Sequence, residues 1–536
     1  MRAPPGFRGT FRSDDPARAL YAEGAGIYRI IPAAVAVPAD RDDLVALVRW
    51  AAESGTALVP RGAGSGMPGG NVGPGVVVDL TFGFRSAPVI NAEARTARAG
   101  ASITYRELND AAATSGLRLP PDPSSGNFCT IGGMVATNAA GAHTVKYGAM
   151  RSWVRGLRLV CADGEVTETG APGHRGTGKS AVEQRLERDV APWLRQHQLP
   201  LENAPPKTRK NSAGYLLANY PDNDWVKHLL IGSEGTLAFI TEVEVALAPL
   251  PASRSTLLVT LASLDDVAPA VRALSPLAPS ALELLDRTYL DFVRVTGSRV
   301  PSGTEALLLV EFEGDARSGE RAVQGIAATT AVADDPAAVN RLWELRHLAS
   351  PILAGLPDHL RSLQVVEDGC VPLEQLGACI KGLRRIAAAC GFQVVIFGHA
   401  GDANVHANML VDVHAADLAD RLERCLREVS AVQIALGGTT TGEHGDGRLR
   451  APFLEALYGA TYLEGCRRVK AAFDPRGIMN PGVKLTADGP RLTADMLKVG
   501  SGAPALPAGV ADALRRIERE ALWGQDRLNL PSSAVV

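Results

Sequence analysis

The segment Ala57-Leu58-Val59-Pro60-Arg61-Gly62-Ala63-Gly64-Ser65-Gly66 joins a short apolar run to a glycine-rich loop. The apolar run predicts a buried strand, and residues 34–37 and 76–80 predict strands on either side of it. Residues 40–54 carry apolar side chains at helical spacing and predict a helix. These elements together indicate a βαβ unit with the glycine-rich loop at the end of one strand.

The glycine-rich loop matches the dinucleotide fingerprint Gly-x-Gly-x-x-Gly only in part. Met67-Pro68-Gly69-Gly70 follows it and breaks the helix that the fingerprint requires. The loop does offer a run of unhindered backbone N–H groups, which suits a pyrophosphate. From this motif alone, a plain glycine-rich turn is an equal alternative.

Length, composition and charge limit the class of protein. The chain has 536 residues, which predicts two or three domains, and its net charge of −3 argues against nucleic acid as a partner. We find no apolar run typical of a secretory signal in residues 1–18 and no stretch that predicts a transmembrane helix. The seven cysteines form no Cys-x-x-Cys pair, which argues against a cluster or zinc-ribbon motif and favours reduced thiols in the cytoplasm.

Further elements follow along the chain. Short apolar runs predict strands at residues 157–162, 229–231, 242–247, 256–262, 306–313 and 394–397. Periodic segments predict helices at residues 267–274, 337–353 and 373–390, and residues 249–251 read as a linker. After Lys484 we expect a tail with an amphipathic segment at residues 510–522.

Several motifs in a fixed order resemble one known family. Pro120-Pro121-Asp122-Pro123-Ser124-Ser125 precedes Thr130-Ile131-Gly132-Gly133-Met134-Val135-Ala136-Thr137-Asn138, and Ile231-Gly232-Ser233-Glu234-Gly235-Thr236-Leu237 comes later. The last of these motifs is the family's closing motif, Phe473-Asp474-Pro475-Arg476-Gly477-Ile478-Met479-Asn480-Pro481-Gly482. From about residue 32 to residue 484 it resembles the FAD-linked oxidases of the vanillyl-alcohol oxidase and p-cresol methylhydroxylase superfamily. Within them it is similar to the D-2-hydroxy acid dehydrogenases that act on D-lactate, glycolate or D-2-hydroxyglutarate.

The resemblance implies an α+β fold. It implies a two-subdomain FAD-binding domain of the p-cresol methylhydroxylase type at residues 32–251, followed by an α+β substrate-binding cap domain with an antiparallel sheet at residues 252–485. Residues 1–31 and 486–536 would be terminal extensions.

The resemblance also implies which residues bind the cofactor FAD: Pro60, Arg61, Gly62, Ala63, Gly64, Ser65 and Gly66 at the pyrophosphate; Pro121, Asp122, Ser124, Ser125, Gly132, Gly133, Ala136, Asn138 and Gly141 along the flavin; Glu234, Gly235 and Ile240 at the adenosine half; and Asn480 over the isoalloxazine. Covalent relatives carry a histidine where this chain has Ser65, so we expect non-covalent FAD. His143 lies near the second loop but matches no attachment motif.

A second cofactor is indicated by two glycine-rich loops. Gly398-His399-Ala400-Gly401-Asp402-Ala403-Asn404-Val405-His406 and Gly442-Glu443-His444-Gly445-Asp446-Gly447 supply imidazoles and a carboxylate. Two histidines with one carboxylate form a ligand set for a divalent metal with open positions, which predicts His399, His406 and Glu443 as ligands for Zn, Mn or Fe. His444 would face the other way and act as the catalytic base. Structural polar loops are the alternative.

A substrate carboxylate needs a cationic partner. Arg209 and Lys210 align with a family segment that reaches the substrate pocket, and Arg346 is another candidate, with Tyr215 as a hydrogen-bond donor. For each cation a solvated surface position is the alternative.

We therefore expect an enzyme that oxidises a D-2-hydroxy acid to the 2-oxo acid by hydride transfer to flavin, with D-lactate favoured over D-2-hydroxyglutarate and glycolate. The alternatives are a metal-independent flavin oxidase of a sugar or alcohol and a flavin-binding subunit of a multi-protein oxidase.

Electrons would leave to a separate cytochrome, quinone, electron-transfer flavoprotein or iron–sulfur subunit. The tail is a candidate docking site for that partner, although packing on the same chain is favoured. A homodimer and a peripheral membrane location stay open.

Overall fold

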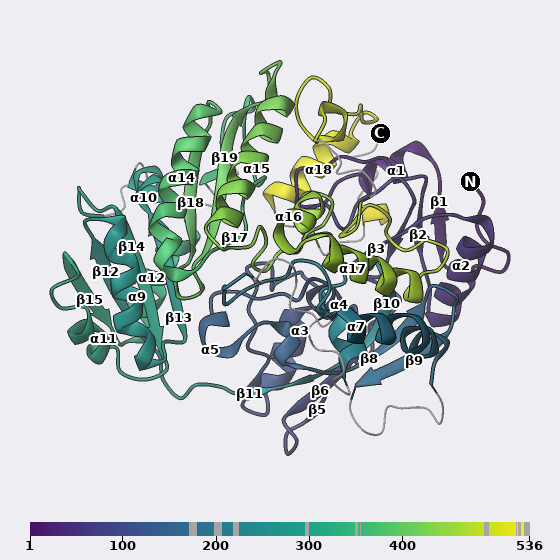
Figure 1. Ribbon diagram of the computed structural model, residues 1–536, viewed down its shortest axis with the longest axis horizontal. Helices are drawn as coiled ribbons and strands as arrows, with labels where there is room; N and C mark the ends of the chain where they lie inside the picture. Colours follow the sequence, from purple (N-terminus) through teal and green to yellow (C-terminus); the bar gives the residue numbers. More distant parts are fainter. Residues whose placement is uncertain are drawn as a thin grey trace.

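The computed structural model describes residues 1–170, 179–197, 206–217, 224–294, 300–348, 352–353, 355–486, 492–520, 522–523 and 527–529. It contains helices and sheets whose strand pairs are mostly antiparallel, which confirms the α+β class. The cap lies on one side of the molecule and the N-terminal half on the other, with the C-terminal helices between and above them (Figure 1).

A small mixed sheet carries the glycine-rich loop. Its strand order is β1 (Thr10–Arg12), β2 (Ala34–Val37), β4 (Val76–Asp79) and β3 (Leu58–Arg61). β2 and β3 both run parallel to β4, so the predicted βαβ unit is confirmed, with α2 (Arg41–Ser54) as its crossover helix. Asp40 caps α2 by accepting from the backbone of Asp43.

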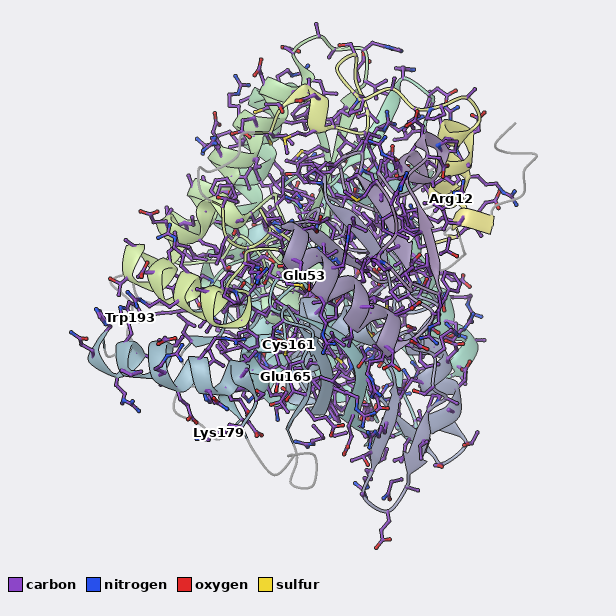
Figure 2. All side chains as sticks on the ribbon, turned by 90° about the vertical axis from the view of Figure 1, so that its right-hand side faces the viewer. Arg12, Glu53, Cys161, Glu165, Lys179 and Trp193 are labelled. Atoms are coloured by element: carbon purple, nitrogen blue, oxygen red, sulfur yellow. The ribbon has the colours of Figure 1, made fainter. Side chains whose placement is uncertain are left out.

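A second, five-stranded sheet lies below the first in the view of Figure 1. Its order is β5 (Val89–Asn91), β6 (Thr96–Gly100), β10 (Ala238–Ala246), β8 (Val154–Cys161) and β9 (Val166–Gly170). The apolar side chains of α2 share a core with Val160 and Phe239 from this sheet. In Figure 2, Glu53 on α2 and Cys161 on β8 mark the two elements. The helix therefore joins the two sheets into one unit, which corresponds to the predicted FAD-binding domain and which we call the FAD-binding unit.

Shorter elements complete this half of the chain: α1 (Asp15–Leu20), α3 (Tyr105–Ala113), β7 (Leu117–Arg118), α4 (Ile131–Thr137), α5 (Thr144–Tyr147), α6 (Ala181–Arg185), α7 (Ala191–His197), α8 (Trp225–Leu230) and β11 (Ala248–Pro249). The strand predicted at residues 229–231 is wrong, because Leu229 and Leu230 end the helix α8. An apolar run of three residues cannot distinguish a strand from a buried helix end.

The cap is built on one antiparallel sheet. Its order is β15 (Thr329–Ala333), β12 (Ser255–Leu261), β14 (Ala306–Phe312), β13 (Ala281–Asp286), β18 (Gln393–His399), β19 (Asn404–Asp412) and β16 (Leu360–Leu363), and β17 (Gly369–Cys370) also pairs with β19. Its helices are α9 (Val267–Leu274), α10 (Arg287–Arg294), α11 (Arg317–Ala322), α12 (Pro336–His347), α14 (Leu376–Ala389) and α15 (Leu418–Ala435). The helix predicted at residues 337–353 corresponds to α12. Residues 349–351 of the predicted range lie outside the described residues.

After the cap sheet the chain returns to the FAD-binding unit. α16 (Leu454–Tyr458) and α17 (Ala460–Phe473) bury their apolar side chains in the same core as β8 and β10, as their central position in Figure 1 illustrates. Met479 then forms a bridge with Leu58 of β3. The closing motif is thereby placed next to the glycine-rich loop.

The C-terminal tail packs on the same chain. Val510, Leu514 and Ile517 of α18 (Val510–Arg519) are buried against Tyr21 and Val59. The hypothesis that this apolar face is free to dock a partner is therefore wrong for these positions, and the alternative is confirmed. Among the described residues, no helix is long and apolar enough to cross a membrane.

Candidate active site

Two histidines share one face of the hairpin formed by β18 and β19. The register places Phe397 opposite His406 and His399 opposite Asn404. Cross-strand partners and residues two apart point to the same face, so His399 and His406 are neighbours on it. The centroids of their rings lie 5.0 Å apart. The tight turn between the strands includes Ala403 in the left-handed region, with φ of 52°.

Both imidazoles are oriented through Nδ1. Glu283 on β13 pairs in register with His399, and its Oε1 lies 2.5 Å from His399 Nδ1. His406 Nδ1 donates to the backbone oxygen of Glu367 at 2.6 Å. Each Nδ1 is thus engaged, so Nε2 is the atom of each ring that could serve as a metal ligand. Glu283 in turn accepts from Arg346 Nε at 2.9 Å.

The two Nε2 atoms converge on one carboxylate oxygen. Glu443 Oε1 lies 3.0 Å from His399 Nε2 and 3.2 Å from His406 Nε2. Its Oε2 accepts from Lys210 Nζ at 2.7 Å. Burial opposes ionisation of Glu443, but Lys210 and His399 outweigh it and hold the pKa of the carboxyl well below its usual range. The predicted ligand set is therefore assembled, with a carboxylate that stays ionised.

The loop that carries Glu443 is held by a buried carboxylate. Asp368 accepts from the backbone N–H groups of Glu443 and His444, at 3.1 and 2.8 Å, and from the hydroxyl of Thr441 at 2.6 Å. Gly442 N also donates to the backbone oxygen of Asp368 at 2.8 Å. These bonds fix the direction in which the two side chains leave the loop.

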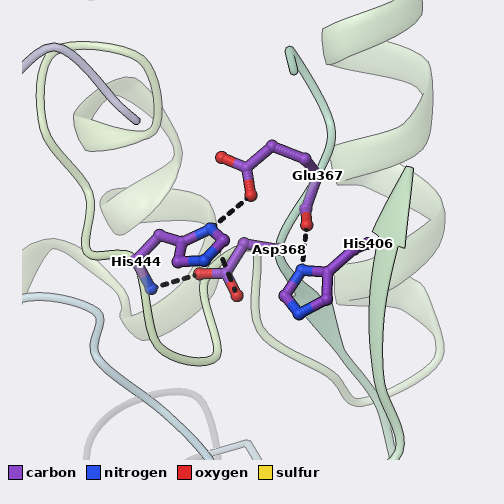
Figure 3. A group of neighbouring side chains, drawn as sticks. All are labelled: Glu367, Asp368, His406 and His444. Carbon is purple, nitrogen blue, oxygen red and sulfur yellow. Dashed lines mark hydrogen bonds and ion pairs between the residues drawn. The ribbon is translucent and has the colours of Figure 1, made fainter. Parts of the chain in front are cut away.

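His444 stacks beside His406, as Figure 3 shows. The ring centroids are 5.1 Å apart and the planes differ by 20°. Glu367 Oε2 lies 2.5 Å from His444 Nδ1, and the other oxygen of Glu367 accepts from the buried Arg450. Burial lowers the pKa of His444, but the charges of Glu367 and Asp368 overcome this and raise it to about 9. Its Nε2, 3.9 Å from Glu443 Oε1, is the atom directed at the metal-ligand group.

A second group of potential ligand atoms consists of Glu367, Asp368, His406 and His444 (Figure 3). Its atoms already bond to one another, to Arg450 and to the Glu443 loop. The Nδ1 atoms of both imidazoles contact Glu367, and the Asp368 carboxylate holds the Glu443 loop, so these groups already orient the two rings and the loop. We therefore assign these residues to orientation of His406 and His444 rather than to a second metal.

The predicted FAD-binding segments meet at one place. A Cβ on Gly62 would lie 2.6 Å from Thr130 Oγ1, and one on Gly235 would lie 2.8 Å from Pro60 Cγ. Glu234 N donates to Ala136 O at 2.8 Å, which joins the second and third segments. Gly64, with φ of 79°, adopts a conformation that favours glycine.

Asn480, which comes from the C-terminal part of the chain, contacts the same predicted FAD-binding segments. Its Nδ2 donates to Gly70 O at 2.8 Å and to Glu234 O at 2.9 Å. Its Oδ1 is buried and has no hydrogen-bond partner among the described residues. A buried acceptor left open in a glycine-lined cradle fits a bound ligand with donors, as a flavin has. The FAD-binding roles of these residues remain predictions.

Two of the predicted FAD-binding residues, Arg61 and Glu234, use their side chains in contacts with other parts of the chain. The guanidinium of Arg61 is buried, donates to Glu23 O at 2.8 Å and lies 5.3 Å from the centre of the Tyr21 ring. The side chain of Glu234 accepts from the backbone of Asp446 and Gly447, both at 2.8 Å, and from Lys484 Nζ at 3.1 Å. Both side chains are therefore committed to contacts within the chain, so a side-chain role in binding FAD is not supported.

The four substrate candidates lie in different settings. Lys210 is paired with Glu443, and Arg346 with Glu283. The Arg209 side chain is 56% exposed and approaches Asp402 to 3.6 Å. Tyr215 is buried in the core of the FAD-binding unit, where its hydroxyl bonds to Thr236 Oγ1 at 2.6 Å. The expected hydrogen bond from Tyr215 to substrate is contradicted by this placement.

Sequence reasoning missed Glu283, Glu367, Asp368, Arg450 and Lys484. The adjacent acids Glu367 and Asp368, after the apolar pair Val365-Val366, were the one usable signal, because acids next to a buried segment need partners. Glu283 lies 116 residues before His399, and only the strand register brings them together.

Two family models match the chain: the FAD binding domain over residues 32–170, and the C-terminal domain of FAD linked oxidases over residues 250–483. The glycolate oxidase subunit GlcD of Bacillus subtilis is 31% identical over 476 residues, 86% of this chain and 90% of the relative. The D-lactate dehydrogenase of Archaeoglobus fulgidus is 31% identical over 459 residues, 84% and 90% of the two chains. The D-2-hydroxyglutarate dehydrogenase of Pantoea ananatis is 28% identical, and the match covers 95% of this chain and 54% of the relative.

The matches and the FAD-binding fold define a flavoprotein oxidoreductase. The chain belongs to the FAD-linked oxidase family. A solved structure of alkyldihydroxyacetonephosphate synthase superimposes with a TM-score of 0.56 at 16% identity, over 88% of this chain and 82% of that one. The predicted α+β fold with a p-cresol methylhydroxylase-type FAD-binding domain is thereby confirmed.

Proposed function

We propose that the protein is an FAD- and metal-dependent D-2-hydroxy acid dehydrogenase that produces the 2-oxo acid. The observation that carries this proposal is the convergence of His399 Nε2 and His406 Nε2 on Glu443 Oε1, with His444 stacked beside them. The relative named D-lactate dehydrogenase, at 31% identity, supports D-lactate as the favoured substrate, and the glycolate oxidase subunit has the same identity. D-2-Hydroxyglutarate and glycolate are the alternatives that other relatives suggest.

His399, His406 and Glu443 would hold the metal. Three ligands of this kind leave open positions for a substrate and suit Zn, Mn or Fe. When bound, a divalent cation supplies positive charge that lowers the pKa of a coordinated hydroxyl, as it lowers that of water from about 15.7 to about 7, and also that of the nearby His444. Lys210 on Glu443 Oε2 leaves Oε1 as the oxygen that faces the imidazoles.

His444 would take the hydroxyl proton at Nε2. Glu367 accepts from Nδ1, which fixes the ring and the tautomer and stabilises the imidazolium that forms. Arg450 holds Glu367 from the far side and keeps it ionised: burial raises the pKa of Glu367, but Arg450 and His444 bring it down to about 2. The bound FAD supplies the acceptor for the hydride that leaves Cα.

Arg346 is the favoured partner for the substrate carboxylate. Its Nε is fixed by Glu283, and its guanidinium lies over the Phe397 ring at 4.4 Å, beside the two histidines. Lys210 is committed to Glu443 and Arg209 is largely exposed. A guanidinium anchored through Nε can still present its outer N–H groups to a carboxylate.

The electrons would pass from the flavin to a separate acceptor: a cytochrome, a quinone, an electron-transfer flavoprotein or an iron–sulfur subunit. We place the enzyme in the cytoplasm or at the membrane surface. Its FAD would be non-covalent, because Ser65 stands where covalent relatives carry a histidine.

The test is an anaerobic screen of D- and L-2-hydroxy acids that follows loss of flavin absorbance, with metal content measured on the same sample. We expect one D-2-hydroxy acid to reduce the flavin of metal-loaded protein. Reduction by a sugar or alcohol after complete chelation would favour the metal-independent oxidase. A flavin that no 2-hydroxy acid reduces would favour a flavin-binding subunit, a reading to which the relative named a glycolate oxidase subunit lends support.

A further inference from the structure

His143 connects the cap to the segment from Pro121 to Gly141, which is predicted to line the flavin and which we call the flavin loop. Its Nδ1 lies 2.5 Å from Asp122 Oδ2, and its backbone N donates to Asp122 Oδ1 at 3.0 Å. Its Nε2 lies 2.9 Å from Glu311 Oε1 on β14. Asp122 belongs to the FAD-binding half and Glu311 to the cap sheet, so one imidazole links two units whose residues are far apart in sequence.

The surroundings favour an imidazolium that donates to both carboxylates. Burial lowers the pKa of His143, but Asp122 and Glu311 outweigh it and raise it to about 10. The Glu311 side chain is 2% exposed and also accepts from Ser280 Oγ at 2.9 Å. The ring of His143 stacks near Trp343 of α12. A neutral imidazole has only one N–H and could satisfy only one of the two acids.

The residues that follow His143 also contact the cap, and Arg118 from the FAD-binding half joins them there. Lys146 Nζ donates to Glu313 Oε2 at 2.7 Å, and Arg118 donates to Glu313 Oε1 at 2.8 Å. A Cβ on Gly401 would lie 2.6 Å from Val145 Cγ2, so α5 packs directly on the turn between His399 and Asn404. α5 therefore lies between the flavin loop, the cap strand and the loop that carries a metal ligand.

We propose that His143 is a positioning residue that ties the flavin loop to the cap through Asp122 and Glu311, and so sets the flavin relative to His399, His406 and His444. This inference rests on the proposed function. Neither the metal ligands nor the base touches His143 through any contact found among the described residues. Its loss should therefore misplace the flavin without removing a group that binds substrate or accepts the proton.

The first test compares His143→Ala and His143→Gln with wild type by anaerobic stopped-flow reduction. We expect the limiting rate of flavin reduction to fall about 10- to 100-fold, because a misplacement of about 1 Å can cost that much. The apparent substrate dissociation constant should stay within about twofold, because substrate binding depends on other residues. His197→Ala is the matched control: this exposed histidine stacks on Trp193 and should leave the rate unchanged. A limiting rate in both His143 variants within twofold of wild type overturns the proposal.

The second test needs no substrate, so it separates failure of this inference from failure of the proposed function. Glu311→Gln removes the cap partner of His143 and should weaken FAD binding several-fold, measured by flavin fluorescence on dilution. In a His143→Ala background the same change should add nothing, because the link is already broken. Glu305→Gln, which removes a cap carboxylate paired with Arg287 and Arg384, is the control. Unchanged FAD affinity in Glu311→Gln, or an equal effect in both backgrounds, overturns the proposal even if no 2-hydroxy acid reduces the enzyme.

Discussion

Lys210 Nζ lies 2.7 Å from Glu443 Oε2, and both side chains are buried. The lysine comes from the FAD-binding half and the glutamate from the loop after α15, so this pair joins the two halves at the candidate metal site. Asp402 lies 3.6 Å from the same ammonium. Removing the lysine would leave buried negative charge without its partner.

Lys210→Met should destabilise the metal-free protein by about 3–5 kcal/mol, the usual cost of breaking a buried ion pair. Divalent metal should restore part of this loss, because it brings positive charge back to Glu443. Thermal unfolding with and without Zn or Mn measures the effect. Lys146→Met, which breaks a more exposed pair with Glu313, is the control. An equal gain from metal in Lys210→Met and wild type would contradict the assignment of Glu443 as a ligand.

Glu283→Gln should weaken metal binding about 10- to 100-fold, the usual effect of changing the partner of a ligating histidine. The carboxylate holds His399 Nδ1 at 2.5 Å, and a neutral amide holds it less firmly. The measurement is competition for metal against a chelating dye, with Glu305→Gln as the matched control. Wild-type affinity in Glu283→Gln would show that His399 needs no such support.

His444→Ala should slow anaerobic flavin reduction by about 10²-fold or more, because the hydroxyl proton loses its acceptor. Metal and FAD content should stay at wild-type levels, since the ligands are other residues. Glu367→Gln should have a smaller effect in the same direction, because it loosens the ring without removing it. Near-normal reduction in His444→Ala would refute its role as base.

The stability of the link at His143 should fall as pH rises. Its pKa is about 10 in the folded protein, above the roughly 6.5 of an unfolded chain. A raised pKa contributes stability that is complete below about 6.5 and is lost as pH rises through about 10. Between these values the slope of this single group approaches about 1.4 kcal/mol per pH unit. The measurement is the free energy of denaturant unfolding of wild type and of His143→Gln from pH 6 to 10. The difference between the two curves isolates the contribution of His143. Parallel curves would contradict the ionised bridge.

The candidate metal ligands could be predicted because the sequence holds them close together. His399 and His406 occupy one hairpin, where strand register alone puts them on the same face. Glu443 and His444 are adjacent, so locating one loop locates both. The p-cresol methylhydroxylase-type fold was predicted for a similar reason, since its glycine motifs are local signals in a fixed order.

The partners of these residues could not be predicted, because they depend on contacts distant in sequence. Glu283 reaches His399 only through the pairing of β13 with β18, and Arg450 reaches Glu367 across the core. The tail shows the same limit: its amphipathic pattern was correct, but its packing on Tyr21 and Val59 was not visible in the pattern. Tyr215 was misassigned because motif alignment does not say which way a side chain points.

The central claim is that a divalent cation on His399, His406 and Glu443 prepares a 2-hydroxy acid for oxidation by the flavin. The most direct measurement is the rate of anaerobic flavin bleaching by the best D-2-hydroxy acid, before chelation, after it, and after metal is added back. We predict that bleaching is lost on chelation and restored by Zn, Mn or Fe in wild type, but not in Glu443→Gln. Bleaching at the original rate after complete removal of metal would contradict the claim.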